Sequence, residues 1–142
     1  MANRILCCLL SLVAGSAMAQ AGHVKTVRGQ AHIVSAGVST PAQPGAPVAM
    51  GDIVQTGPDG ALGITLKDNT LLSFGPSTAF KLEEFLFEPA QNRLQLAGNI
   101  AAGSLHMVSG TIARLKPQAV QIKTPSGIVG VRGTRFVVVV QE

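Results

Sequence analysis

Turn-forming residues interrupt this chain so often that no long helix fits between them. Glycine and proline occur 16 and 8 times in 142 residues, and with Asp and Asn they separate short apolar stretches at a spacing of roughly 8–12 residues. Leu62, Ile64 and Leu66 alternate with Gly63 and Thr65, which is the period of a half-buried strand. No segment keeps a helical period over three turns. The sequence therefore predicts an all-β single domain of short antiparallel strands and hairpins, built as a sandwich, a roll or a solenoid.

The predicted strands follow these turns. A hairpin with a glycine break joins residues 24–28 to 31–34, and residues 35–50 form a loop rich in small residues and proline. A tight Asp-Asn turn joins the strand around Ile64 to its return at residues 70–74. Residues 100–108 fit either a strand or a short helix. Further strands are predicted at residues 53–55, 79–82, 85–87, 94–96, 120–123, 128–131 and 136–140.

The N-terminus has the three parts of a secretory signal. Arg4 precedes an apolar run over residues 5–14, and Ala17-Met18-Ala19 is a small-residue cleavage site. The alternative is an uncleaved anchor, but the run is shorter than the roughly 20 residues that a membrane span requires. We therefore expect residues 1–19 to be a cleaved signal peptide and residues 20–142 to form the domain. The mature chain is then periplasmic or secreted, with no stable membrane span.

Signal cleavage changes the composition that the fold must use. Cys7 and Cys8 both lie in the signal, so the mature chain has no cysteine and must be held together by its core. Loss of Arg4 lowers the formal charge from +4 to +3. Without Trp or Tyr, and with so little charge, the chain is not expected to bind nucleic acid.

The sequence offers no convincing catalytic or metal site. Ser77, Ser104, Ser109 and Ser126 each stand beside glycine or proline and are predicted to be turn residues. The adjacent Glu83 and Glu84 should point to opposite faces of a strand, which would prevent them from acting as a carboxylate pair. The histidines are too scattered for a metal site, lying at His23, His32 and His106. We expect no catalytic residue, no metal and no cofactor.

The basic residues Lys123, Arg132 and Arg135 gather near the C-terminus. Planar guanidinium groups suit the recognition of anions and carboxylates. The structural alternative is that arginine binds loop carbonyls and locks a hairpin, and this alternative is favoured for Arg132. For Arg135 both interpretations stay open. These three residues are the candidate partner or ligand contacts.

Two stretches of the chain resemble the FecR domain family. Residues 51–61 and 66–74 resemble its first half, which runs G-D-x-I-x-T-G-x-D-G/S, a strand, and D-G/N-S/T. Residues 124–137 resemble its closing motif, T-P-x-x-x-x-G-V-R-G-T-x-F-x-V, and residues 110–117 are similar to a linking stretch of stand-alone members. The matching structural-motif residues are Gly51, Asp52, Gly60, Asp68, Thr124, Pro125, Gly127, Gly130, Gly133, Thr134 and Phe136.

This resemblance implies a fold and a role. FecR domains are all-β and are known as periplasmic sensor parts of iron–siderophore signalling, where a cytoplasmic segment controls a sigma factor. The chain lacks that segment and a retained span, so it resembles the exported, stand-alone form, for which the family implies no catalytic residues. Stand-alone members often continue past the closing strand. Here four valines, residues 137–140, directly precede Gln141 and Glu142, so this apolar strand should either be central or be covered by a partner strand.

The favoured function is a non-catalytic periplasmic interaction module for an unidentified envelope protein, in envelope signalling or assembly. Its partner would bind by strand addition at a sheet edge. The alternatives are a binder of small anionic ligands that uses Arg132 and Arg135, and a hydrolase without a recognisable motif.

Overall fold

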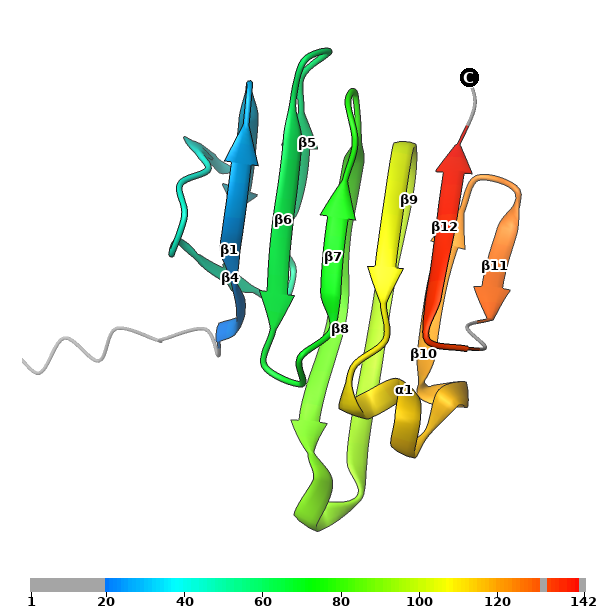
Figure 1. The fold of residues 1–142 in the computed structure, drawn as a ribbon. Helices are drawn as coiled ribbons and strands as arrows, with labels where there is room; N and C mark the ends of the chain where they lie inside the picture. Colours follow the sequence, from blue (N-terminus) through cyan, green and yellow to red (C-terminus); the bar gives the residue numbers. More distant parts are fainter. Residues whose placement is uncertain (1–19, 131–132, 141–142) are drawn as a thin grey trace, which may run out of the picture.

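The computed structural model describes residues 20–130 and 133–140, and most of its regular structure is β-strand (Figure 1). The predicted signal and Arg132 lie outside the described residues. The strands are β1 (Gln20–Arg28), β2 (Ala31–Ser35), β3 (Val38–Pro41), β4 (Pro47–Ala49), β5 (Ile53–Thr56), β6 (Ala61–Leu66), β7 (Leu71–Phe74), β8 (Ala79–Glu88), β9 (Arg93–Val108), β10 (Val120–Thr124), β11 (Gly127–Gly130) and β12 (Arg135–Val140). A short helix, α1 (Thr111–Leu115), and the 3-10 turns Pro89–Gln91 and Pro117–Ala119 complete the elements.

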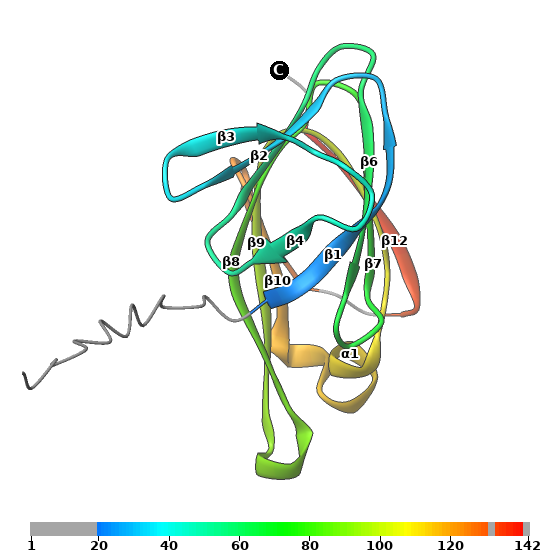
Figure 2. The same cartoon turned by 90° about the vertical axis from the view of Figure 1, so that its left-hand side faces the viewer.

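The strands form two facing layers, which Figure 2 shows from the side. We call the layer with β4, β1, β6, β7, the second half of β9, and β12 the front sheet, in that order of pairing. The back sheet contains β3, β2, β5, β8, the first half of β9, β10 and β11. All pairs are antiparallel except β9 with β10, which is parallel. The prediction of an all-β fold of antiparallel strands is therefore confirmed, and the architecture is a curled sheet in two layers, open at the side of β11 and β12 (Figure 1).

Strand β9 belongs to both layers (Figure 1). It pairs with β8 up to Ala102 and with β12 from Gly103 onward, so it passes from the back sheet to the front sheet at a corner at Gly103. Gly103 has φ +91°, in the left-handed region that side chains disfavour. A Cβ atom at this position would also collide with the backbone and hydroxyl of Thr78. The Thr78 hydroxyl accepts a hydrogen bond from the Ser104 amide at 3.1 Å and donates one to the Gly75 carbonyl at 2.8 Å. The corner is thus held by one fully buried threonine.

The core lies between the sheets and is almost entirely aliphatic. In β6, Leu62, Ile64 and Leu66 are each about 2% exposed, as their alternation predicted. Along β9 the core-facing positions are even-numbered before the corner and odd-numbered after it, because the change of sheet at Gly103 exchanges the two faces of the strand. The residues of β9 in the hydrophobic core are Leu94, Leu96, Ile100, Leu105 and Met107.

The structure corrects several local predictions. The β6–β7 hairpin is confirmed, but the hairpin predicted from residues 24–28 and 31–34 is wrong. Strand β1 pairs with β4 and β6, whereas β2 pairs with β3 and β5 in the other sheet. The predicted loop at residues 35–50 contains β3 and β4, and residues 100–108 belong to β9. Within residues 20–130 and 133–140, no helix is long and apolar enough to span a membrane.

Candidate functional site

Lys123 is engaged in an ion pair on the outer surface of the back sheet. Its Nζ lies 3.0 Å from Oε2 of Glu83 on β8, and the Asn99 side-chain amide donates to the other carboxylate oxygen at 3.4 Å. The Lys123 side chain is 44% exposed and that of Glu83 is 25% exposed. Lys123 therefore neutralises an acid of its own chain instead of standing as a free cation.

A bulge in β8 places Glu83 and Glu84 on the same side of the sheet. Leu82 pairs with Gly98 and Glu84 pairs with Ala97, so Glu83 is an extra residue in the ladder. Both glutamates line one polar hollow of about 460 Å³, and the prediction that they point to opposite faces is wrong. The sequence pattern indicates this bulge, because the core-facing positions change from the even-numbered Phe80 and Leu82 to the odd-numbered Phe85 and Phe87. The other residues that line the hollow are Leu94, Gln95, Ala97, Lys116, Gln118, Ala119, Gln121 and Lys123.

The surroundings of Glu83 do not suit a general acid. The hydrogen bond from Lys123 lowers the pKa of Glu83 below its ordinary value, and the amide of Asn99 acts in the same direction. A general acid that works near neutral pH needs a raised carboxyl pKa. Glu83 is therefore a structural ion-pair partner.

Replacing Lys123 with methionine should raise the pKa of Glu83 toward its ordinary value, which an NMR titration of the side-chain carboxyl would measure. Because the folded-state pKa is lowered, the pair stabilises the fold above the pKa of an unfolded glutamate. That contribution is lost as the pH falls through the folded-state pKa. Its size should stay below about 1 kcal/mol, since both side chains are partly exposed.

The matched control is Lys81→Met, because Lys81 contributes least to the lowered pKa of Glu83. Equal titration of Glu83 in the wild-type and Lys123→Met proteins would contradict this assignment.

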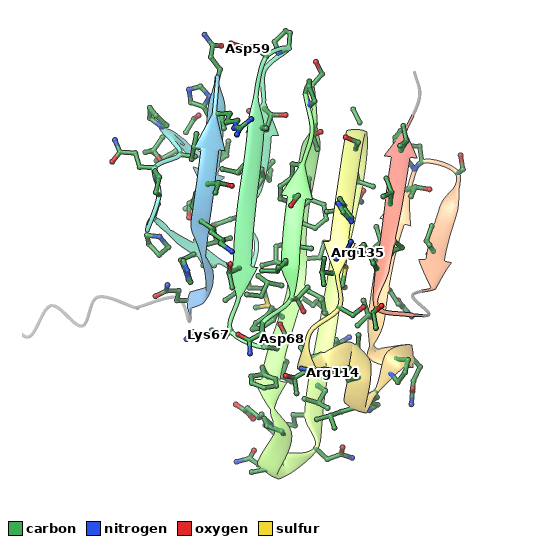
Figure 3. The ribbon with its side chains drawn as sticks, viewed as in Figure 1. Asp59, Lys67, Asp68, Arg114 and Arg135 are labelled. Carbon is green, nitrogen blue, oxygen red and sulfur yellow. The ribbon has the colours of Figure 1, made fainter. Side chains whose placement is uncertain are left out.

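The three predicted basic contacts do not form one described cluster. Lys123 lies on β10 of the back sheet, and Arg135 lies at the start of β12 in the front sheet, where it is exposed (Figure 3). Arg132 is outside the described residues. An anion site built from these residues remains a prediction.

The two aspartates of the first motif have structural roles. Asp52 is 4% exposed, and its carboxylate accepts hydrogen bonds from the Ser35 hydroxyl at 2.7 Å and from the Ala49 amide at 2.9 Å. These contacts tie the turn before β5 to the end of β2. Gly51, with φ +92°, and Gly60 stand in the turns at the two ends of β5.

Asp68 connects the β6–β7 turn to helix α1. It is 1% exposed, and its carboxylate accepts hydrogen bonds from the Thr70 amide at 3.1 Å, the Thr70 hydroxyl at 2.8 Å and the Ile112 amide at 3.1 Å. Gly110 packs so closely on this turn that a Cβ atom would overlap the Thr70 amide and the Asp68 carbonyl. Figure 3 shows Asp68 beside α1, at the end of the front sheet opposite Asp59.

The closing motif builds the turn between β10 and β11 and the entry to β12. The Thr124 hydroxyl donates to the Gly127 carbonyl at 3.0 Å and accepts from the Ser126 amide at 3.2 Å. Pro125 occupies the same turn, and Gly130 ends β11. Before β12, the carbonyls of Gly133 and Thr134 accept hydrogen bonds from the Ser109 hydroxyl at 3.0 Å and the Ser109 amide at 2.8 Å. Phe136 is half-buried against the core.

Strands β11 and β12 form an open side of the molecule. Among the described residues, β12 pairs only with β9, and β11 pairs only with β10. Strand β12 is therefore an edge strand, and neither expectation for residues 137–140, a central place or a covering strand, is met by the described part of the chain. Three aliphatic side chains here are more than 60% exposed: Ile128, Val137 and Val139. We use "open side" for β11, β12 and the groove between them.

The groove of the open side has a volume of about 640 Å³ and is lined by both sheets. Val138, Val139 and Val140 contribute from β12, and Val129 contributes from β11. Ala101 of β9 and the turn residues Thr124, Pro125 and Ser126 complete the lining. The inward valines Val138 and Val140 are half-buried against the core, so the groove continues the apolar interior to the surface.

The histidines lie on three separate strands: His23 on β1, His32 on β2 and His106 on β9. In the described part of the chain, no group of three or more His, Cys, Asp or Glu side chains is arranged to hold a metal ion. His106 lies on the front sheet between Ser73 and Val137, and its Nε2 atom is buried without a hydrogen-bond partner among the described atoms.

Comparison with known proteins identifies one family. The family model described as FecR protein matches residues 52–142, which include the buried aspartates, the bulge and the whole open side. Neither the curated proteins nor the solved structures contain a match.

Proposed function

The chain belongs to the FecR family, and from this premise we propose that it is a non-catalytic module of the cell envelope that binds a protein partner at its open side. Family membership implies a function related to envelope signalling, in which FecR proteins act with partners. The signal-like pattern of residues 1–19 supports export, and the periplasm is the proposed location.

The observation that carries this proposal is the exposed apolar surface of the open side. Isolated exposed aliphatic residues are ordinary, but Ile128, Val137 and Val139 stand on two strands that each have an edge left unpaired by the described residues. Such an edge is a template for association unless it is shielded by charge, proline or a covering segment. Strand β12 carries one charged residue, Arg135, and no proline. These features are typical of a surface that is covered by a partner.

The buried polar groups support a binding role over a catalytic one. Asp52, Asp68 and Thr78 have their hydrogen-bonding capacity used by backbone amides, carbonyls and hydroxyls of turns. Their contacts stabilise the two-layer scaffold, and Glu83 is held ionised by Lys123.

Photo-cross-linking in the source cells tests the location of the partner. A photoreactive residue at Val137 or Ile128 should give a covalent adduct with an envelope protein, because both side chains are exposed at the open side. Met50 is the matched control, since it is also exposed, at 48%, but follows β4 at the far end of the strand order. Adducts at Met50 that equal or exceed those at Val137 and Ile128 would contradict the proposal.

A further inference from the structure

We propose that β12 is the docking strand of the open side, and that its occupant is an extended, acidic segment of the partner protein that adds to the free edge of β12. This inference rests on the proposed function and specifies its contact.

The hydrogen-bond phase of β12 shows which backbone groups are free. The Ser109 amide donates to the Thr134 carbonyl at 2.8 Å, so the backbone N–H and C=O groups of Thr134 point toward β9. Because this direction alternates along a strand, the backbone groups of Phe136, Val138 and Val140 also point toward β9. The pairing of β9 with β7 leads to the same assignment of backbone directions, because the Gly75 amide donates to the Ser104 carbonyl at 3.2 Å. Ser104 thus faces β7, and its neighbours Gly103 and Leu105 face β12. The N–H and C=O groups of Arg135, Val137 and Val139 consequently point away from β9, toward the free edge.

Strand β12 is a better template than β11. It has six residues, four of them valine, and β-branched residues favour extended backbone. Strand β11 has four residues and begins and ends with glycine, which weakens strand pairing. A segment added to β12 would therefore find a longer and stiffer edge.

The side chains beside this edge define the sequence pattern of the occupant. Alternate residues of an added strand project to opposite faces. On one face they would meet the outward valines Val137 and Val139, each 61% exposed. On the other face they would enter the groove beside Val138 and Val140. The occupant should therefore carry apolar, β-branched side chains on both faces along these valines.

The positive charge of Arg135 on β12 favours an acidic occupant. The sequence contains no aspartate or glutamate from residue 89 to residue 141, while basic residues recur through that stretch. Two of them, Arg93 and Lys123, are paired with Glu88 and Glu83 of the same chain, whereas Arg135 lies on β12 itself. Arg135 is exposed on the same face of β12 as Val137, and opposite charges directly across two strands stabilise pairing. Figure 3 shows Arg135 on the front sheet and Arg114 on α1 below it. An aspartate or glutamate of the occupant should stand opposite Arg135.

Selection of a phage-displayed random peptide library on the full chain tests these features. The selected peptides should carry a run of β-branched residues next to an acidic residue. Their affinity should fall about tenfold or more for Val137→Pro and for Val139→Pro, since each proline removes one edge donor worth about one hydrogen bond. Arg135→Glu should shift the selected peptides from acidic to basic residues.

Matched controls separate edge pairing from loss of the fold. Val137→Thr keeps the amide and should retain peptide binding, and both proline variants should keep the wild-type circular dichroism spectrum because their amides face away from β9. Val138→Pro removes a donor to β9 and should destabilise the fold.

Peptides that bind the folded proline variants with wild-type affinity, or that show no acidic preference, would overturn the inference. If the chain forms a dimer that Val139→Pro abolishes, the occupant is a second copy and the inference is wrong. Cross-links that persist at Val137 in any of these cases would leave the proposed function intact.

Discussion

The Asp68→Ala variant is expected to lose about 3 kcal/mol of unfolding free energy, because the buried amides of Thr70 and Ile112 would both lose their acceptor. The variant also frees the Thr70 hydroxyl, which donates to the same carboxylate at 2.8 Å. Chemical denaturation would measure the effect as a lower midpoint with an unchanged slope. Since Asp68 anchors α1 to the β6–β7 turn, amide exchange should increase first in these two segments.

Asp59→Ala is the matched control for this variant. Asp59 is also an aspartate in a turn, the one between β5 and β6, but it is exposed (Figure 3). Its replacement should change the unfolding free energy by no more than about 0.5 kcal/mol. A loss smaller than about 1 kcal/mol for Asp68→Ala would show that water or a rearranged turn replaces the carboxylate.

The Gly103→Ala variant should be destabilised by about 3–4 kcal/mol. The unfavourable positive φ accounts for about 1–2 kcal/mol, and crowding against Thr78 in a packed corner adds about 1–3 kcal/mol. The substitution acts where β9 passes from one sheet to the other, so both sheets should lose stability together. Thermal unfolding followed by circular dichroism would report a single transition at a lower temperature.

Gly130→Ala controls for the general effect of replacing a strand glycine. Gly130 lies in open space at the end of β11 and does not have a positive φ, so alanine should be tolerated there. An unchanged melting temperature for Gly103→Ala would mean that the corner does not depend on this conformation.

Much of the secondary structure could be predicted from local patterns. The alternation of Leu62, Ile64 and Leu66 with small residues defined β6, and the Asp68-Asn69 turn predicted its pairing with β7. The resemblance to FecR domains rested on the same turns, and the family comparison confirmed it over residues 52–142. These predictions succeeded because they depend on residues that are neighbours in the chain.

The site was harder to predict because it depends on irregularities of the strands. The change of inward positions from Leu82 to Phe85 indicates a bulge, yet the simple rule of alternation placed Glu83 and Glu84 on opposite faces. Lys123 was identified as a candidate contact, but its partner Glu83 stands 40 residues earlier in the chain. A charge on a strand can be recognised from sequence, whereas its ion pair requires the order of the strands.

The sequence by itself determined the β class, most turns and most of the residues that face the core, because turn chemistry and alternation are local properties of the backbone. Only the tertiary structure decided which strands are neighbours. Every strand offers the same N–H and C=O groups, so pairing is selected by long-range packing. For this reason β1 and β2, adjacent in the chain, lie in different sheets, and β12 pairs with β9 instead of β11. The same packing leaves the valines of β12 at an open edge, where the proposed partner would bind.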